Sequence, residues 1–344
     1  MRVGIEPVRA RLRAPFVSSG GAVDFRDLLL LRLEDGSGAV GFGEAAPLES
    51  YDGVDIAACL AALEDCREVL ARADGEDRAQ VLAECERVAV LPQAVAAVDL
   101  ALWDLAGHRA RKPVWRLLGA AAADPVEVNY TIAAEDRAGA ASQAAHARAA
   151  GFPLVKVKVG IGDDAGRLAA VRAAGGLDLA IRLDANGAWG VPDAAVALRA
   201  FEPIGIELCE EPVRGLRAVA ELAEISAVPV AIDETAAAPG ALDERVCDSV
   251  CLKVARCGGI SGVLDAARRA RSVGYRVYLA STLDGPLGIA AALHAAAALA
   301  PDRPCGLATI GLFAEREDPL PARDGRVALP AGDGLGNSLQ DWYR

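Results

Sequence analysis

The sequence predicts an α/β protein in which a (β/α) barrel follows an N-terminal α+β domain. From about residue 126, short apolar segments alternate with helical segments rich in Ala and Arg, and eight strand candidates recur at intervals of roughly 20–28 residues. The preceding residues have strand-like and then helical patterns without this alternation. Because regular alternation favours a closed parallel sheet, we expect a C-terminal modified TIM barrel with an N-terminal capping domain.

The α+β capping domain is predicted over residues 1–120. Residues 2–13 and 25–34 have the apolar, β-branched character of strands, and the segment 14–21 between them contains Ser and Gly. That composition predicts a mobile loop that could cover a site. From about residue 53 to 118, apolar residues recur at helical spacing, which completes an α+β pattern.

The barrel is predicted over residues 121–310, and residues 311–344 return to sequence rich in Pro, Gly and Asp that should pack back on the capping domain. The strand candidates are short apolar runs bounded by polar or Gly-containing turns. They are residues 126–132, 154–159, 180–183, 206–209, 228–232, 249–254, 276–280 and 305–307.

Composition excludes several classes of protein. A net charge of −12, with no basic stripe, disfavours a nucleic-acid partner and an anionic membrane surface. The longest apolar stretch, 287–300, is too short to span a bilayer. The eight scattered cysteines include no CxxC pair, and the chain begins directly with strand-like sequence. These features predict reduced thiols and a cytoplasmic location.

Lysine is rare in this chain, and its positions are informative. Lys and Arg together number 36, but only four are lysines. Lys156, Lys158 and Lys253 lie inside apolar, β-branched runs, where solvated surface lysines seldom occur. Lys can lose its proton when its surroundings lower its pKa, whereas Arg stays charged. We therefore expect buried amines that point into a cavity.

Two of these lysines should act together. Lys156 and Lys158 alternate with valines, so they share one face of their strand. Their mutual repulsion, together with a nearby divalent cation, would lower their pKa values and leave one of them as a neutral base near pH 7 and the other as a charged auxiliary. The alternative is that they simply form ion pairs that stabilise nearby carboxylates.

Acidic residues follow three successive strand candidates. Asp184 and Glu210 are 26 residues apart, and Asp233 follows after 23 more, which is about one βα unit each time. Carboxyl ends of barrel strands meet at one mouth, so the three side chains should converge. A single acid at such a position is often only a helix cap. Three with matched spacing predict a cation site, and oxygen ligands without His favour Mg²⁺, with Mn²⁺ as a substitute.

A divalent cation that faces lysines suits one type of reaction. The cation binds the carboxylate of a small-molecule substrate, a lysine removes the proton α to that carboxylate, and the cation stabilises the enediolate intermediate. Without the cation, that proton is too weakly acidic for an amine at neutral pH.

At these residues the sequence resembles the enolase superfamily, specifically its muconate-lactonizing-enzyme subgroup, in which a Lys base acts beside Mg²⁺. The resemblance covers nearly the whole chain. It comprises, in order, residues 41–47, 97–107 and 112–119, the KxK motif at 156–158, the DxN motif at 184–186, the EEP motif at 210–212, the DE motif at 233–234, and Lys253 followed by 257–259.

The resemblance implies a role for each motif. Asp184, Glu210 and Asp233 would bind the metal ion, and Lys158 and Lys253 would be the acid/base pair. Supporting roles around them would fall to Lys156, Asn186 and Glu234.

Within the subgroup the sequence leaves several activities open. Dipeptide epimerases typically carry an Asp-x-Asp motif after the eighth strand, whereas residues 305–313 here contain no acid. Residues 306–309 and 280–284 instead resemble the o-succinylbenzoate synthases. That resemblance implies a lyase of menaquinone biosynthesis that removes water, by syn elimination, from 2-succinyl-6-hydroxy-2,4-cyclohexadiene-1-carboxylate. The alternatives are an isomerase of the same subgroup: N-acylamino acid racemase, dipeptide epimerase or muconate cycloisomerase.

The o-succinylbenzoate synthase hypothesis assigns further residues. Lys158 would take the α-proton and return it to the departing hydroxyl, while Lys253 would stay a cation. Ser281, Thr282 and backbone amides near Gly306 are candidates to bind the succinyl end, although such residues also serve as ordinary turn and cap residues.

Two readings from other classes remain. Lys253 could be the nucleophile of a Schiff-base lyase, which leaves the acidic triple unexplained, or the barrel could bind a ligand without catalysis. The Ala-rich outer helices would also permit a homo-oligomer.

Overall fold

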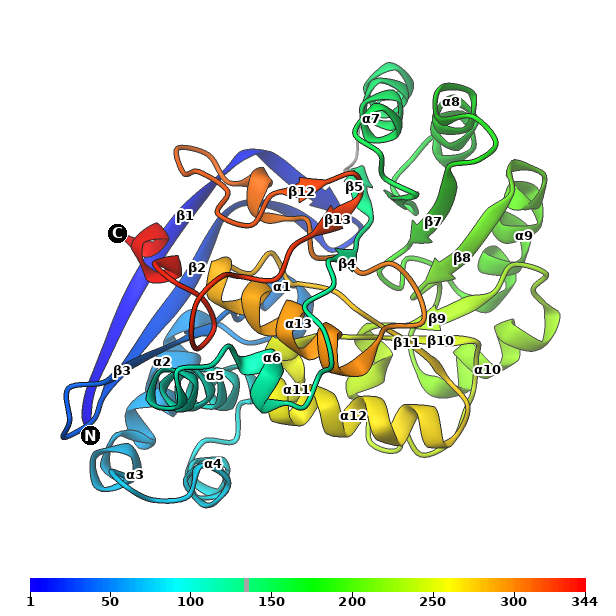
Figure 1. Cartoon of the computed structure of the whole chain (residues 1–344). Coiled ribbons are helices and arrows are strands. Elements are labelled where there is room, and N and C mark those ends of the chain that lie inside the picture. The colour runs from blue at the N-terminus through cyan, green and yellow to red at the C-terminus, as the bar shows by residue number, and fades with distance from the viewer. Residues whose placement is uncertain (133–135) are drawn as a thin grey trace.

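The computed structural model describes residues 1–132 and 136–344, and it has the α/β architecture that the sequence predicts. An antiparallel sheet with its helices occupies one side of the molecule, and a curled parallel sheet with outer helices occupies the other (Figure 1). The two parts lie against each other, and the C-terminus returns to the side of the N-terminal strands. The domain boundaries near residues 120 and 310 remain a proposal.

The N-terminal sheet is longer at its hairpin than predicted. Its strands are β1 (Arg2–Ser18), β2 (Gly21–Glu34) and β3 (Val40–Ala45), in the order β1-β2-β3. The predicted loop over 14–21 is therefore mostly strand, with a register shift between Arg11 and Phe16. The reason is local: Phe16 and Val17 pair with Val23 and Ala22, so the apolar residues of this segment continue the ladder.

Six helices follow this sheet, and the longest of them packs on β3. Gly43 makes this packing possible, since a Cβ atom at this position would lie 2.0 Å from the carbonyl oxygen of Ala97. Only a residue without a side chain lets the strand approach the helix so closely. The helices are α1 (Glu49–Asp52), α2 (Ile56–Asp65), α3 (Arg67–Arg72), α4 (Arg78–Val88), α5 (Pro92–Ala110) and α6 (Val114–Leu117).

The barrel sheet has seven parallel strands in the order β11-β10-β9-β8-β7-β6-β5. The strands are β5 (Tyr130–Ile132), β6 (Leu154–Lys158), β7 (Ala180–Asp184), β8 (Ile206–Glu210), β9 (Val230–Ile232), β10 (Ser249–Leu252) and β11 (Arg276–Leu279). The helices between them are α7 (Arg137–Ala149), α8 (Asp164–Gly175), α9 (Val191–Phe201), α10 (Leu216–Ile225), α11 (Val254–Cys257), α12 (Ile260–Ser272) and α13 (Pro286–Leu299).

The prediction of eight regular strands was wrong at both ends of the barrel. Within 126–132, β4 (Val126–Glu127) pairs with β13 (Arg326–Val327) outside the barrel sheet. The segment 305–307 forms only single bridges, from Cys305 to Val128 and from Gly306 to Ala280. Pro304 precedes this segment and has no amide hydrogen to extend the ladder. Isolated residue pairs therefore close the barrel between β11 and β5.

The two parts of the molecule share buried polar contacts. Arg26 on β2 is buried, and its guanidinium donates to the carbonyl oxygens of Ala46 and Pro47 and to those of Thr282 and Leu283 beyond β11. The C-terminal segment contains β12 (Ala322–Arg323) and β13. Near its end, the hydroxyl of Tyr343 contacts the carboxylate of Glu44 on β3.

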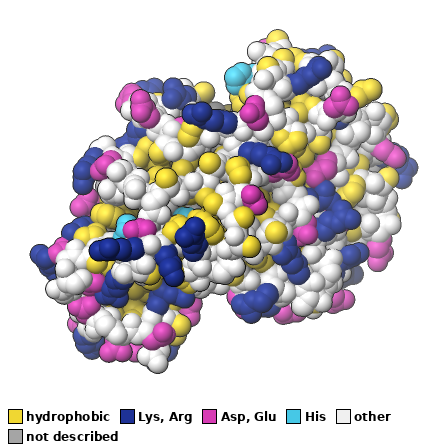
Figure 2. Space-filling view, in the orientation of Figure 1, with side chains coloured by type: hydrophobic (Ala, Val, Ile, Leu, Met, Phe, Trp, Pro, Cys, Tyr) yellow, Lys and Arg dark blue, Asp and Glu magenta, His cyan; other side chains and the backbone are white. Residues whose placement is uncertain are grey.

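Charged side chains of both signs are intermixed over the face seen in Figure 2. Over residues 1–132 and 136–344, no helix is both long enough and apolar enough to cross a membrane. All eight cysteines are free thiols, as predicted.

One buried histidine should make stability depend on pH. His294 on α13 accepts a hydrogen bond at Nδ1 from the amide of Trp115 (3.2 Å), and Nε2 lies 3.1 Å from the carbonyl oxygen of Leu335. These contacts suit the neutral ring, and burial lowers the pKa of His294 to about 4 from 6.5. The folded-state pKa is depressed, so stability is present above pH 6.5 and is lost as pH falls towards 4.

We predict that His294→Gln weakens this pH dependence. Between pH 6.5 and 4, the unfolding free energy of the wild type should fall by about 3 kcal/mol more than that of the variant. Urea unfolding at several pH values measures this difference, with His146→Gln, at an exposed position of α7, as the control. Equal slopes for the wild type and His294→Gln would contradict the prediction.

Candidate active site

A pocket lies at the carboxyl ends of the barrel strands, and the N-terminal sheet forms part of its wall. Phe16, Ser18 and Gly20 of the β1–β2 hairpin line it, together with Tyr51 of α1. The segment 14–21 thus covers a site as strand and turn. From the barrel come Lys156, Lys158, Asp184, Asn186, Asp233, Glu234 and Lys253.

Strand register explains why these side chains meet. Lys158 is paired with Asp184 between β6 and β7, and Asp184 is paired with Glu210 between β7 and β8. The three residues therefore form one row across three adjacent parallel strands. Neighbouring strands lie about 4.8 Å apart, which brings long polar side chains of one row within contact of each other. The spacing seen in the sequence is the spacing of this row.

Each predicted acid/base lysine contacts a predicted metal ligand. The ammonium of Lys158 donates to Asp184 Oδ2 (2.6 Å) and to Asn186 Oδ1 (2.8 Å). Lys253, which directly follows β10, forms an ion pair with Asp233. The two lysines lie four strands apart in the sheet order, and both line the pocket. The curled sheet therefore presents them from different sides of the pocket.

Lys156 is held as a cation by two of the acids. Its ammonium lies 2.8 Å from Asp184 Oδ2 and 2.7 Å from Glu210 Oε1, so it links two of the acids. Burial alone would lower the pKa of Lys156, but these two carboxylates outweigh burial and raise it.

Lys253 behaves in the same way. Burial again favours the neutral amine, but the carboxylate of Asp233 outweighs it and raises the pKa of Lys253. With these contacts in place, Lys253 is a cation.

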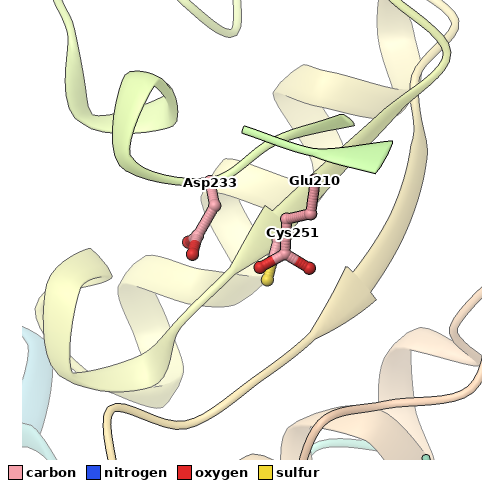
Figure 3. Close-up of side chains that lie close together, drawn as sticks. All are labelled: Glu210, Asp233 and Cys251. Atoms are coloured by element: carbon pink, nitrogen blue, oxygen red, sulfur yellow. The ribbon is translucent and has the colours of Figure 1, made fainter. Parts of the chain in front are cut away.

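The acids form a candidate cation site. Ligand atoms of Glu210, Asp233 and Cys251 all lie within 4.8 Å of one another (Figure 3). Burial raises the pKa of Cys251 well above its usual value, so this sulfur is a protonated thiol and a poor ligand. Asp184 lies beside Glu210 through their shared contact with Lys156. The usable donors are therefore carboxylate oxygens.

The close grouping of acids also suits a cation. Four carboxylates (Asp184, Glu210, Asp233 and Glu234) lie beside three lysines, and the guanidinium of Arg214 also lines the pocket. Asn186 donates to Glu234 Oε1 (3.0 Å), while Glu234 Oε2 is buried without a hydrogen-bond partner. Burial, with the neighbouring carboxylates, raises the pKa of Glu234 to about 7. A hard divalent cation would be an additional partner for these crowded carboxylate oxygens.

Glu211 in the EEP motif positions the strand end that carries Asp233. Its carboxylate accepts hydrogen bonds from the amides of Asp233 (2.7 Å) and Thr235 (3.0 Å), and it also contacts the Thr235 hydroxyl. These contacts fix the backbone from which the Asp233 carboxylate reaches the pocket.

The residues predicted to bind the substrate make different contacts in the structure. The Ser281 hydroxyl lines the pocket and lies 2.9 Å from that of Thr309. The Thr282 hydroxyl instead donates to Asp284 (2.6 Å), as an ordinary turn residue does. The amide of Gly306 itself donates to the Leu279 carbonyl (2.8 Å) in the closing bridge, so the role of backbone amides near Gly306 stays a prediction. Gly306 does line the pocket.

Two tyrosines of the site escaped the sequence analysis. The Tyr51 hydroxyl donates to Asp233 Oδ1 (2.6 Å) and accepts from Lys253 Nζ (2.6 Å), and its ring centroid lies 4.3 Å from that ammonium. The Tyr278 hydroxyl on β11 donates to Glu210 Oε2 (2.7 Å). Neither residue belongs to the periodic pattern of strand ends, so spacing could not reveal it.

Comparison with known proteins agrees with this fold and site. Residues 1–119 match the mandelate racemase/muconate lactonizing enzyme N-terminal domain family, and residues 139–343 match the enolase C-terminal domain-like family. The protein therefore belongs to the enolase superfamily, in its muconate-lactonizing-enzyme subgroup.

Individual relatives have different activities. The chain is 30% identical to L-Ala-D/L-Glu epimerase of Clostridium acetobutylicum over 83% of each chain. It is 26% identical to N-succinyl-L-Arg/Lys racemase of Bacillus cereus, over 84% of this chain and 81% of that one. It is 40% identical to o-succinylbenzoate synthase of Mycobacterium tuberculosis, over 60% of this chain and 64% of that one.

A solved structure of a relative is similar over almost the whole chain. Dipeptide epimerase from Enterococcus faecalis, in complex with Mg and the dipeptide L-Leu-L-Tyr, superposes with a TM-score of 0.88. It is 26% identical and covers 97% of this chain and 98% of its own.

The raised pKa of Glu234 predicts an unusual stabilising substitution. The folded-state pKa of Glu234 lies above its ordinary value of 4.5, so its carboxylate opposes folding once pH rises above 4.5, and fully so above 7. In metal-free protein at pH 8, Glu234→Gln should raise the unfolding free energy by about 2 kcal/mol, and at pH 4 it should change little.

Glu207→Gln is the matched control for this measurement. Glu207 forms ion pairs with buried Arg182 and with Arg303, so its loss should destabilise the protein at pH 8. Urea unfolding in EDTA compares the two variants. A Glu234→Gln variant less stable than the wild type at pH 8 would show that the charge of the Glu234 carboxylate does not lower the unfolding free energy.

Proposed function

We propose that this protein removes a proton α to a substrate carboxylate, and that it is an o-succinylbenzoate synthase. The dehydration of 2-succinyl-6-hydroxy-2,4-cyclohexadiene-1-carboxylate in the cytoplasm, as a step of menaquinone biosynthesis, is part of this proposal. The observation that carries it is the distribution of charge in the pocket. Among the described lining residues, the acids are Asp184, Asp233 and Glu234: the first two are proposed cation ligands, and Glu234 directly follows Asp233.

The rest of the pocket suits an anionic substrate. Ser281, Gly306 and Thr309 line the side next to β11 and carry no charge. Arg214 and the three lysines also line the pocket. A dipeptide would bring an ammonium group that finds no counter-charge away from the cation site, whereas a substrate with two carboxylates meets cations and hydroxyl groups.

Asp184, Glu210 and Asp233 are the residues that would hold Mg²⁺ or Mn²⁺. When bound, the ion supplies a Lewis acid for the substrate carboxylate and makes the α-proton more acidic. The same acids pair with lysines in the structure. A carboxylate bound to the metal ion would attract its lysine less strongly. Its lysine would then lose a proton more easily, which favours a neutral base.

Lys158 and Lys253 then have different roles. Lys158 takes the α-proton at Nζ, and the C–O bond to the departing hydroxyl breaks. Lys158 returns the same proton to that hydroxyl, which leaves as water, so the base is regenerated. Lys253 stays protonated beside Asp233 and Tyr51, and its positive charge faces the substrate from the other side of the pocket.

An N-acylamino acid racemase is the second candidate. The observation in its favour is the pair of lysines on different sides of one pocket, since racemisation needs one group to remove the proton and another to deliver it to the opposite face. A neutral N-acyl group, unlike a free ammonium, needs no acid in the pocket. Similarity to a racemase of N-succinyl amino acids supports this alternative.

A Schiff-base mechanism has less support. Such a nucleophile must be a neutral amine. Lys253 instead forms an ion pair with Asp233, and such a mechanism gives the three acids of the site no role.

The proton-transfer mechanism predicts the effect of two substitutions. Lys158→Ala removes the base, and Asp184→Asn removes a carboxylate of the site. Each should lower kcat by at least about 10³-fold while the far-UV circular dichroism stays that of the wild type. EDTA should abolish activity, and added Mg²⁺ should restore it. Full activity in either variant would exclude the mechanism, and borohydride trapping of an adduct would favour the Schiff base.

A substrate panel tests the particular activity. The o-succinylbenzoate precursor, N-succinyl amino acids, L-dipeptides and muconate are incubated with the enzyme and Mg²⁺ in D₂O. We expect the highest kcat/KM for dehydration of the precursor. Deuterium exchange at the α-carbon of N-succinyl amino acids, without dehydration of the precursor, would instead identify a racemase.

A further inference from the structure

We propose that Tyr278 is a positioning residue that orients the Glu210 carboxylate and thereby sets the affinity of the site for its divalent cation. This inference rests on the proposed function, in which Glu210 is a metal ligand.

The contacts of Glu210 are shared between its two oxygens. The hydroxyl of Tyr278 donates to Oε2 at 2.7 Å, and the ammonium of Lys156 donates to Oε1 at 2.7 Å. Each carboxylate oxygen therefore has one protein donor and keeps lone pairs for a further partner. Donors at both oxygens also fix the rotation of the carboxylate. The phenol approaches from β11, whereas Glu210 lies at the end of β8, so the bond crosses the barrel interior.

The Tyr278 ring is itself held in place by a buried cation. The guanidinium carbon of Arg182 on β7 lies 4.2 Å from the ring centroid. Arg182 Nε donates to Glu207 Oε2 (3.0 Å), and Nη1 donates to the Pro304 carbonyl (3.0 Å). The exposed fraction of Arg182, Tyr278 and Glu210 is 0% for each. The guanidinium also draws electron density from the ring, which strengthens the hydroxyl as a donor.

A space-filling role alone would not need the hydroxyl. A phenylalanine would fill the same volume and leave no polar atom to satisfy in the interior. With tyrosine, the hydroxyl completes a chain from the Glu207–Arg182 pair to the candidate ligand. Without it, Glu210 Oε2 would be buried with no donor, which costs free energy and frees the carboxylate to turn. Partners of metal ligands typically contribute about 10–100-fold in metal affinity.

Metal titration tests this role without any substrate. Mg²⁺ binding to the full-length protein is measured by calorimetry for the wild type, Tyr278→Phe and Tyr275→Phe. Tyr275 is the matched control, because it is also buried and its hydroxyl contacts the Val246 amide (3.0 Å) and the Glu244 carbonyl (3.1 Å). We expect the Kd for Mg²⁺ to rise about 10–100-fold in Tyr278→Phe and to stay within about twofold in Tyr275→Phe.

Two isosteric variants keep the test decisive if Tyr278→Phe does not fold. Tyr278→4-aminophenylalanine retains an N–H donor, and Tyr278→4-methylphenylalanine has the same shape without one. The amino variant should bind Mg²⁺ nearly as the wild type does, and the methyl variant should bind as weakly as expected for phenylalanine. Equal affinity in the two isosteres, or a wild-type Kd in Tyr278→Phe, would overturn the role of Tyr278. Absence of Mg²⁺ binding by the wild type would instead overturn the proposed function itself.

Discussion

The site depends on one constraint: charged groups removed from water must be paired. Lys158, Asp184 and Glu210 satisfy it because strand register places them in one row, and Lys156 joins the two acids from within the barrel. The charged side chains are part of the sheet interior and are buried as the strands pair. Parallel strands in this register would bury isolated ions without these partners, so the sheet and the site require each other.

Each of these carboxylates can pair with a lysine or bind a cation. Acids that hold a cation cannot hold lysines as strongly, so cation binding and the protonation of the lysines are linked. Tyr51 extends this linkage to the N-terminal part, since its hydroxyl contacts both Asp233 and Lys253. The pocket is thus assembled from both parts of the chain, and buried Arg26 ties the backbone segments that form its wall.

Much of this arrangement could be predicted from the sequence. Periodic strand ends located the lysines, the acids and Asn186, because a barrel converts regular spacing into proximity. The pattern failed where contacts are not periodic. Tyr51 and Tyr278 reach the site through tertiary packing, and the Gly306 amide is engaged by a bridge that only the fold reveals. The signs of the pKa shifts at Lys156 and Lys253 also depended on distances to carboxylates, which spacing alone does not give.

Closure of the barrel by single residue pairs has a consequence for how such an enzyme can change. Ser281, Gly306 and Thr309 lie along this seam, where isolated bridges rather than a full strand connect β11 to β5. The charged row lies in the continuous ladder from β6 to β8. Under the proposed function, substitutions along the seam would reshape the uncharged side of the pocket and leave the charged row in register. A fold built this way separates the chemistry it performs from the molecules it accepts.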